Sequence, residues 1–173
     1  MSNERSRKPA ARSDEGASVA MRRRVAEIES RFADRLPCFP SELHGLNHLR
    51  KVAMLAGRIA EAIGADVESA IVAGLLHDCG RTDDRGGNGH ALVSAALARP
   101  LLKELFPHLD AEAICRAIER HADGEVTADP ISAALWDADR LTIGRAGYAI
   151  RQDLLSTEAA KRLATIATSD CSN

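Results

Sequence analysis

Apolar residues recur at helical spacing along most of the chain, and polar stretches rich in glycine or proline separate the apolar segments. An apolar residue at every third or fourth position places one apolar stripe along a helix, and that stripe must pack against other elements. No stretch shows the alternation expected of paired strands. The pattern therefore predicts an all-α domain, with helices over about residues 18–35, 46–63, 66–77, 90–105, 110–121 and 131–143 and one or two more between 149 and 167.

Helix-ending and helix-capping residues fall where the apolar stripes stop. Gly64 is placed to end the second helix, and Asp66 and Asp110 are placed to cap the two helices that begin beside them. Pro100 lies inside the fourth expected helix, where a proline can produce a kink. The polar, glycine-rich stretch 80–89 is a loop suited to the wall of a site.

The two ends of the chain differ from its body. Residues 1–17 have no apolar periodicity and are basic, so we expect a disordered tail, although a nucleic-acid-binding arm or a targeting peptide is the alternative interpretation. Residues 18–167 are expected to form a single domain. Residues 168–173 are expected to be a disordered C-terminus.

Composition excludes several classes of protein. The chain has 173 residues, of which 45% are hydrophobic and 28% charged, as in an ordinary domain with one core. A net charge of −2 and an aromatic content of 3% argue against a stable nucleic-acid partner. The four cysteines form no CxxC pair, and no signal peptide or long apolar run is present. We therefore expect a cytoplasmic protein with reduced thiols and no membrane partner. The sequence is compatible with a homodimer and does not decide the oligomeric state.

Several titratable residues continue the apolar stripes and are expected to point inward. A single inward histidine is more often an ordinary core residue, but an isolated buried carboxylate is strongly disfavoured without a cation or hydrogen-bond donors. Imidazoles and carboxylates on different helices, without a thiolate, favour an octahedral divalent ion such as Mn²⁺, Fe²⁺, Co²⁺, Ni²⁺ or Mg²⁺ over a structural zinc. The residues concerned are His48, His77, Asp78, His121 and Asp139.

Two other histidines allow more than one interpretation. His90 begins a helix after a glycine-rich stretch, so a capping role and a metal-ligand role are equally compatible with its position. His44 lies about one turn before His48 and is either structural or a contact to the substrate or to a metal ligand.

Three segments resemble the HD-domain superfamily of metal-dependent phosphohydrolases. "HGLNHLRKVAMLA" resembles the helix with the first ligand, "AGLLHDCGR" the His-Asp doublet, and "LWDADRLTIGRAG" the late aspartate segment. The resemblance extends over roughly residues 44–152, and the three segments follow one another in the family's order. The resemblance implies a bundle of about six to eight helices with a metal site in its core.

The resemblance also implies one or two divalent metal ions. Asp139, rather than Asp137, matches the aspartate that precedes Arg-Leu, and it also continues the apolar stripe of its helix. Arg81 stands where lysine is commoner in the family. The positions matched to metal ligands are His48, His77, Asp78 and Asp139, with His90 and His121 where some members hold a second ion.

These implications lead to a hypothesis of hydrolysis at phosphorus by a metal-activated water. The substrate is expected to be a nucleotide or another small phosphorylated metabolite. Asp78 is the candidate to bridge two ions or to take the proton of the water, and Arg81 is the candidate to bind the charge of the phosphate. The further candidate substrate contacts are His44, Arg85 and Arg140, the last of which is also expected to pair with a carboxylate.

Two other functions compete with this hypothesis. Related HD-type folds hold a di-iron centre that activates oxygen, and the chain could instead be a non-catalytic module that senses a nucleotide or a metal. A complete set of ligands argues against the sensor, because loss of ligands is its usual sign in a sequence.

Overall fold

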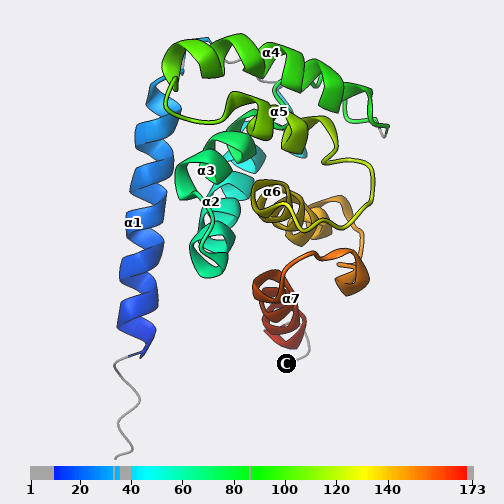
Figure 1. Ribbon diagram of the computed structural model, residues 1–173. Helices are drawn as coiled ribbons and strands as arrows, with labels where there is room; N and C mark the ends of the chain where they lie inside the picture. The colour runs from blue at the N-terminus through cyan, green and yellow to red at the C-terminus, as the bar shows by residue number, and fades with distance from the viewer. Residues whose placement is uncertain (1–9, 33, 36–39, 86, 171–173) are drawn as a thin grey trace, which may run out of the picture.

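The structure, a computed structural model, describes residues 10–32, 34–35, 40–85 and 87–170, and this part of the chain is helical without strands (Figure 1). The predicted all-α class is therefore confirmed. The elements are α1 (Ala10–Ser30), α2 (Leu46–Ile63), α3 (Val67–Leu76), α4 (Gly89–Leu105), α5 (Ala111–Glu119), α6 (Pro130–Leu141), the short 3₁₀ helices η1 (Ile143–Ala146) and η2 (Gln152–Leu154), and α7 (Glu158–Asp170).

The helix ends follow the capping residues. The side chain of Asp66 accepts a hydrogen bond from Ser69 N at the start of α3, and Asp110 accepts one from Ala113 N at the start of α5. Gly64 ends α2 in the left-handed conformation, with φ of 71°, which glycine adopts without a steric penalty. Helix α4 continues through Pro100.

The two outer helices are longer than predicted. α1 begins at Ala10 instead of at residue 18, and α7 continues to Asp170 instead of stopping at residue 167. A segment without an apolar stripe can extend a helix that is already packed, because propagation costs far less than nucleation. Residues 10–17 and 168–170 are thus helical, and the rest of the two predicted tails lies outside the described residues.

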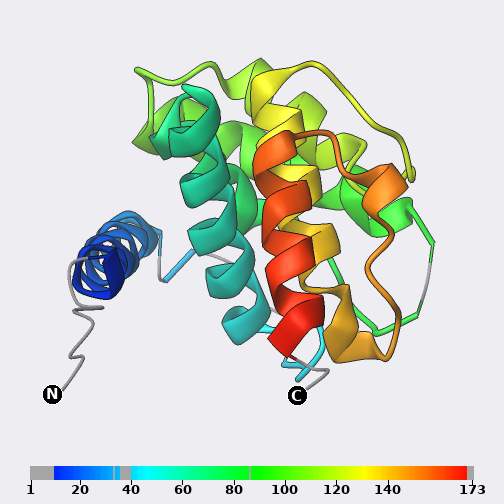
Figure 2. The same ribbon diagram turned by 90° about the horizontal axis from the view of Figure 1, so that it is seen from below.

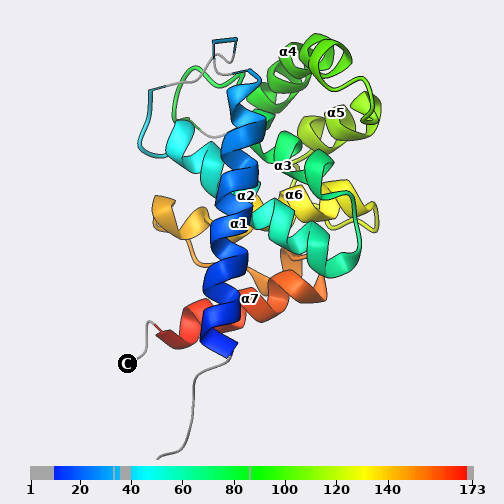
Figure 3. The same ribbon diagram turned by 90° about the vertical axis from the view of Figure 1, so that its left-hand side faces the viewer.

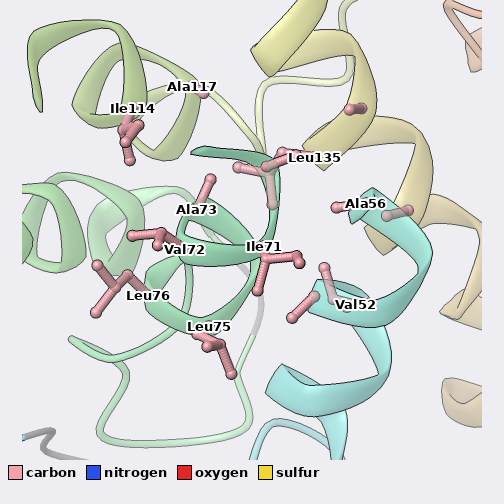
Figure 4. Packing of buried hydrophobic residues seen from close by; sticks show 14 of the residues in the cluster. Val52, Ala56, Ile71, Val72, Ala73, Leu75, Leu76, Ile114, Ala117 and Leu135 are labelled. Carbon is pink, nitrogen blue, oxygen red and sulfur yellow. The ribbon is translucent and has the colours of Figure 1, made fainter. Parts of the chain in front are cut away.

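Helices α2 and α3 form the centre of the bundle, and α3 is buried on all sides. In Figure 4, Val52 and Ala56 of α2 lie next to Ile71 of α3, and Leu135 of α6 also lies beside α3. A Cβ atom added to Gly74 of α3 would lie 2.5 Å from Ala53 Cα of α2. The two helix backbones therefore approach each other as closely as a glycine allows.

The other helices surround this pair. Helix α4 packs on α5 at one end of the bundle, and α7 packs on α2 and α6 at the other end (Figures 1 and 3). Helix α1 lies along one side of the bundle (Figures 2 and 3). Phe32, just after its C-terminal end, contacts Phe106, which directly follows α4, with the ring centroids 5.5 Å apart. The core thus holds the ends of five helices near one another, and the candidate ligands lie at those ends.

Candidate metal centre

Helix ends bring all the predicted ligand residues into one cluster. Each residue lies in the first or last turn of its helix or directly after it, so that short polar segments of the chain meet above an apolar core. His48 lies in the first turn of α2, His77 and Asp78 follow α3, His90 is in the first turn of α4, His121 follows α5, and Asp139 lies near the end of α6.

One side of the cluster contains His48, His77 and Asp139. His48 Nε2 lies 3.1 Å from His77 Nε2 and 3.3 Å from Asp139 Oδ1. Asp78 Oδ2 faces the same side, at 3.6 Å from His77 Nε2 and 3.8 Å from His48 Nε2. Three of these groups, His48, His77 and Asp139, form a set with donor atoms within 4.8 Å of one another, the spacing expected around a metal ion.

The other side contains His90 and His121, whose Nε2 atoms are 3.1 Å apart. The second carboxylate oxygen of Asp78, Oδ1, lies 3.2 Å from His90 Nε2 and 3.5 Å from His121 Nε2. The carboxylate of Asp78 therefore lies between the two sides, with one oxygen toward each. Asp78 as a whole is only 3% exposed to solvent.

The hydrogen bonds of two histidines indicate what the cluster can hold. His77 Nδ1 lies 2.8 Å from Gly74 O, and His121 Nδ1 lies 2.8 Å from Ile118 O. A carbonyl oxygen only accepts, so each Nδ1 carries the proton and each neutral ring directs an Nε2 lone pair into the cluster. Lone pairs and carboxylate oxygens that face one another repel unless a proton or a metal ion lies between them. The donor set therefore fits divalent metal ions.

The electrostatics of the protein alone agree with this fit. Burial lowers the pKa of His77 to about 4 and that of His90 to about 4, so both rings are neutral at pH 7 and available as ligands. Burial alone would raise the pKa of Asp78, but the neighbouring His77, His121 and Arg81 outweigh it and hold that pKa well below its usual range.

His121 differs from the other histidines. Burial lowers its pKa, but the hydrogen bond to Asp78 and the charges of Asp139 and Asp78 outweigh burial, so its pKa is raised. A proton and a metal ion are alternative occupants of the same Nε2 lone pair.

Arg81 lies beside Asp78 and His90. Its Nε is 3.2 Å from Asp78 Oδ2, its Nη2 is 2.9 Å from His90 Nε2, and its Nη1 donates to Arg85 O at 2.9 Å. The guanidinium thus supplies positive charge beside the Asp78 carboxylate.

Two cavities open beside Arg81. One, of 320 Å³, is bounded by Asp139, His44, Arg81 and Arg85, and the other, of 480 Å³, is bounded by Arg81, Arg85 and His90. Of the predicted substrate contacts, His44, Arg81 and Arg85 therefore line the space next to the cluster. His44 is held there by Asp84, whose Oδ1 lies 2.7 Å from His44 Nδ1.

Arg140 lies elsewhere. It donates to Leu154 O at 2.6 Å and lines a separate cavity, and it does not bound the one that contains Asp139. The neighbouring Asp137 is fully buried and accepts hydrogen bonds from the backbone N–H groups of Ser156 and Thr157, at 2.7 and 2.8 Å. The assignment of Asp139, rather than Asp137, to the cluster agrees with this geometry.

Sequence reasoning did not single out Asp84, which holds His44, or Tyr148, which also bounds the cavity that contains Asp139. Both lie in loops, where neither helical periodicity nor a motif indicates which way a side chain points. A carboxylate within the polar loop that follows the His-Asp doublet was the available signal for Asp84. For Tyr148, the signal was the chain's single tyrosine in a glycine-containing turn.

The model of the HD domain family matches residues 45–166, most of the described chain. The chain belongs to the HD domain family. A crystal structure of a predicted HD superfamily hydrolase from an uncultured Thermotogales bacterium superposes with a TM-score of 0.62 at 27% identity, covering 87% of this chain and 86% of that one. The chain is thus an HD-superfamily metal-dependent hydrolase, and HD domains bind divalent metals.

Curated relatives of this HD domain include enzymes named Ribonuclease Y. That of Mycoplasma mycoides is 36% identical over 103 residues, which are 59% of this chain, and that of Geobacter sulfurreducens is 32% identical over 126 residues, which are 72% of it. The chain covers only 23% and 22% of the lengths of these two relatives. Within the described residues, none of the helices has the length and apolarity needed to cross a bilayer.

Proposed function

We propose that this HD domain hydrolyses a phosphoester or phosphoanhydride bond in a nucleotide or another small phosphorylated metabolite. The observation that carries the proposal is the position of Asp78, whose Oδ2 lies toward His77 and His48 and whose Oδ1 lies toward His90 and His121. A carboxylate in that position is suited to bridge two divalent ions. His48, His77 and Asp139 would hold one ion, and His90 and His121 the other. Such ions polarise a phosphoryl oxygen and lower the pKa of a bound water.

The remaining residues supply binding and orientation. Gly74 O and Ile118 O fix the ring orientation of His77 and His121, in the way that backbone acceptors commonly orient metal-ligating histidines. Arg81 and Arg85 bring positive charge to the cavity that contains Asp139, where it would attract and position phosphate oxygens. Release of Arg81 from His90 would free both the guanidinium for phosphate and the imidazole for a metal.

The size of the cavity supports a small substrate. Its 320 Å³ lies at the lower end of the range of about 300–1,000 Å³ typical of small-molecule sites. A mononucleotide or a smaller phosphorylated metabolite is a suitable size for such a space. We also propose that the protein is cytoplasmic, as the sequence predicts.

A phosphodiester of RNA is the second candidate substrate, because the curated relatives carry the name Ribonuclease Y. This chain covers less than a quarter of those relatives, so their activity comes to it only as a proposal. The two candidates share the same reaction at phosphorus and differ in whether the chain binds more than one nucleotide.

The test is hydrolysis by the chain loaded separately with Mn²⁺, Co²⁺, Ni²⁺, Fe²⁺ and Mg²⁺. The substrates are nucleoside mono-, di- and triphosphates, small phosphorylated sugars, a generic phosphodiester and an oligoribonucleotide. We expect turnover with at least one ion, and a fall of more than about 100-fold in Asp78→Asn, since even the partners of metal ligands contribute 10–100-fold.

Asp110→Asn is the matched control. Asp110 caps α5 through its side-chain oxygen, and asparagine caps a helix equally well, so this variant should keep wild-type activity. A metal-loaded wild type that turns over none of these substrates would rule out the proposal. A visible iron absorption band with consumption of oxygen would favour the di-iron alternative instead.

A further inference from the structure

Beside the metal centre, one aromatic side chain is exposed. Tyr148 is 67% exposed, whereas Phe32, Phe106 and Trp136 are buried in the core. Among the Phe, Tyr and Trp residues that the structure describes, Tyr148 alone is exposed. Exposure of a large ring gains nothing for folding, and this ring stands next to the cluster, so a role in binding is its natural explanation.

Tyr148 bounds two cavities. It bounds the cavity of 320 Å³ that contains Asp139, Arg81 and Arg85, and it also bounds a second cavity of 320 Å³, whose walls include Ile143 and Leu154. Tyr148 and Ile143 therefore border both the charged space at the metal centre and the second space, whose walls also include Arg140 and Arg151.

The backbone that carries Tyr148 is a defined turn. η1 ends at Ala146, and Gly147 follows with φ of 81°. This is the left-handed region, in which residues other than glycine are strained. The turn brings the chain back toward η2 and sets Tyr148 at the border of the two cavities.

Arg140 also lines the second cavity. Its Nη1 donates to Leu154 O, while its Nη2 is buried with no hydrogen-bond partner among the described residues. A buried donor without an acceptor costs free energy. A ligand in this cavity that brings an oxygen or an aromatic ring nitrogen within reach of the guanidinium would supply the acceptor.

We propose that Tyr148 and the second cavity form a subsite for a nucleobase. The inference rests on the proposed function, because the phosphate of the same ligand would lie at Arg81 and Arg85 beside the cluster. A nucleobase has a flat aromatic face for the tyrosine ring and acceptor atoms on its edge for Arg140. The substrate class is then narrowed from any phosphorylated metabolite to a nucleotide, either free or as one residue of an RNA.

The test compares the binding of two ligands that differ only in the base. They are the phosphonate analogues of adenosine 5′-monophosphate and of ribose 5-phosphate, in which CH₂ replaces the ester oxygen, so neither ester bond can be hydrolysed. Isothermal titration calorimetry on the Mn²⁺-loaded protein gives the ratio of the two dissociation constants. We expect the adenosine analogue to bind about 10-fold more tightly, as stacking of one base on an aromatic side chain provides.

The variants assign that ratio to the ring. Tyr148→Ala should reduce it to about one without changing the affinity for the ribose analogue, and Tyr148→Phe should keep it. Val126→Ala, at a loop residue that is 54% exposed and bounds neither cavity, should leave the ratio unchanged. A ratio near one in the wild type, or an unchanged ratio in Tyr148→Ala, would overturn the inference.

Two further measurements distinguish the base subsite from the hydrolytic function, and RNA from a free nucleotide. Hydrolysis of ribose 5-phosphate or another substrate without a base by Tyr148→Ala shows whether the proposed function stands independently of the subsite. An oligoribonucleotide that binds more tightly than the mononucleotide analogue, and loses affinity in Tyr148→Ala, assigns the base to RNA. Equal affinity assigns it to a free nucleotide.

Discussion

The close approach of α2 and α3 at Gly74 makes Gly74→Ala the most informative perturbation of this fold. The new Cβ would lie 2.5 Å from Ala53 Cα and 2.7 Å from Ala53 N, which are backbone atoms and cannot rotate away. To restore an ordinary contact of 3.4 Å, the two helices must separate by about 0.9 Å at this point. Because α3 is buried on all sides, that movement disturbs its packing against α5 and α6 as well.

The expected cost is about 2–3 kcal/mol of unfolding free energy, toward the upper end of the usual cost of overpacking a core. For a domain of this length, that corresponds to a fall in Tm of about 4–12 °C. The effect should extend to metal binding. His48 belongs to α2 and His77 follows α3, and their Nε2 atoms are only 3.1 Å apart. We expect affinity for Mn²⁺ to fall by about 10-fold or more.

Urea denaturation with and without Mn²⁺ measures both effects. Gly16→Ala is the matched control, since Gly16 lies in α1 with no atom within 4 Å of its added Cβ, and alanine there should stabilise the helix by up to about 1 kcal/mol. If Gly74→Ala unfolds within 0.5 kcal/mol of the wild type, or is destabilised with unchanged Mn²⁺ affinity, the argument that this contact fixes the metal centre fails.

Three further outcomes follow from the contacts described. Asp137→Ala should cost about 2–3 kcal/mol in urea denaturation, because the N–H groups of Ser156 and Thr157 lose their acceptor, while Mn²⁺ affinity measured by calorimetry stays unchanged. Trp136→Phe should cost about 1–2 kcal/mol in the same assay, because its ring donates a hydrogen bond to the buried carbonyl of Ala117; an unchanged midpoint would contradict this. Addition of Mn²⁺ at 100 times its dissociation constant should stabilise the chain by about 2.7 kcal/mol, and EDTA should remove that gain; an equal Tm in both conditions would mean that the folded protein does not bind the ion.

Much of the fold could be predicted because its information is local. The apolar stripes and the capping aspartates located the helices, and the same stripes showed that His48, His121 and Asp139 point inward. A titratable side chain on an apolar stripe needs a polar or charged partner, and in the structure all three side chains find theirs in the same cluster.

What the sequence could not predict depends on loops or on the absence of a pattern. The contact between His44 and Asp84 joins two loops, and the place of Arg140 depends on how the chain turns after α6. Residues 10–17 have no apolar stripe, yet they belong to the same helix as the residues that follow them. The binding role proposed for Tyr148 depends on the two cavities beside its ring, which the sequence does not reveal.

The most direct test of the account is anomalous diffraction from crystals grown with Mn²⁺, recorded near the manganese absorption edge. The account predicts two peaks on opposite sides of the Asp78 carboxylate, one among His48, His77 and Asp139 and the other beside His90 and His121. Crystals that contain Mn²⁺ with no anomalous peak in this cluster would contradict it.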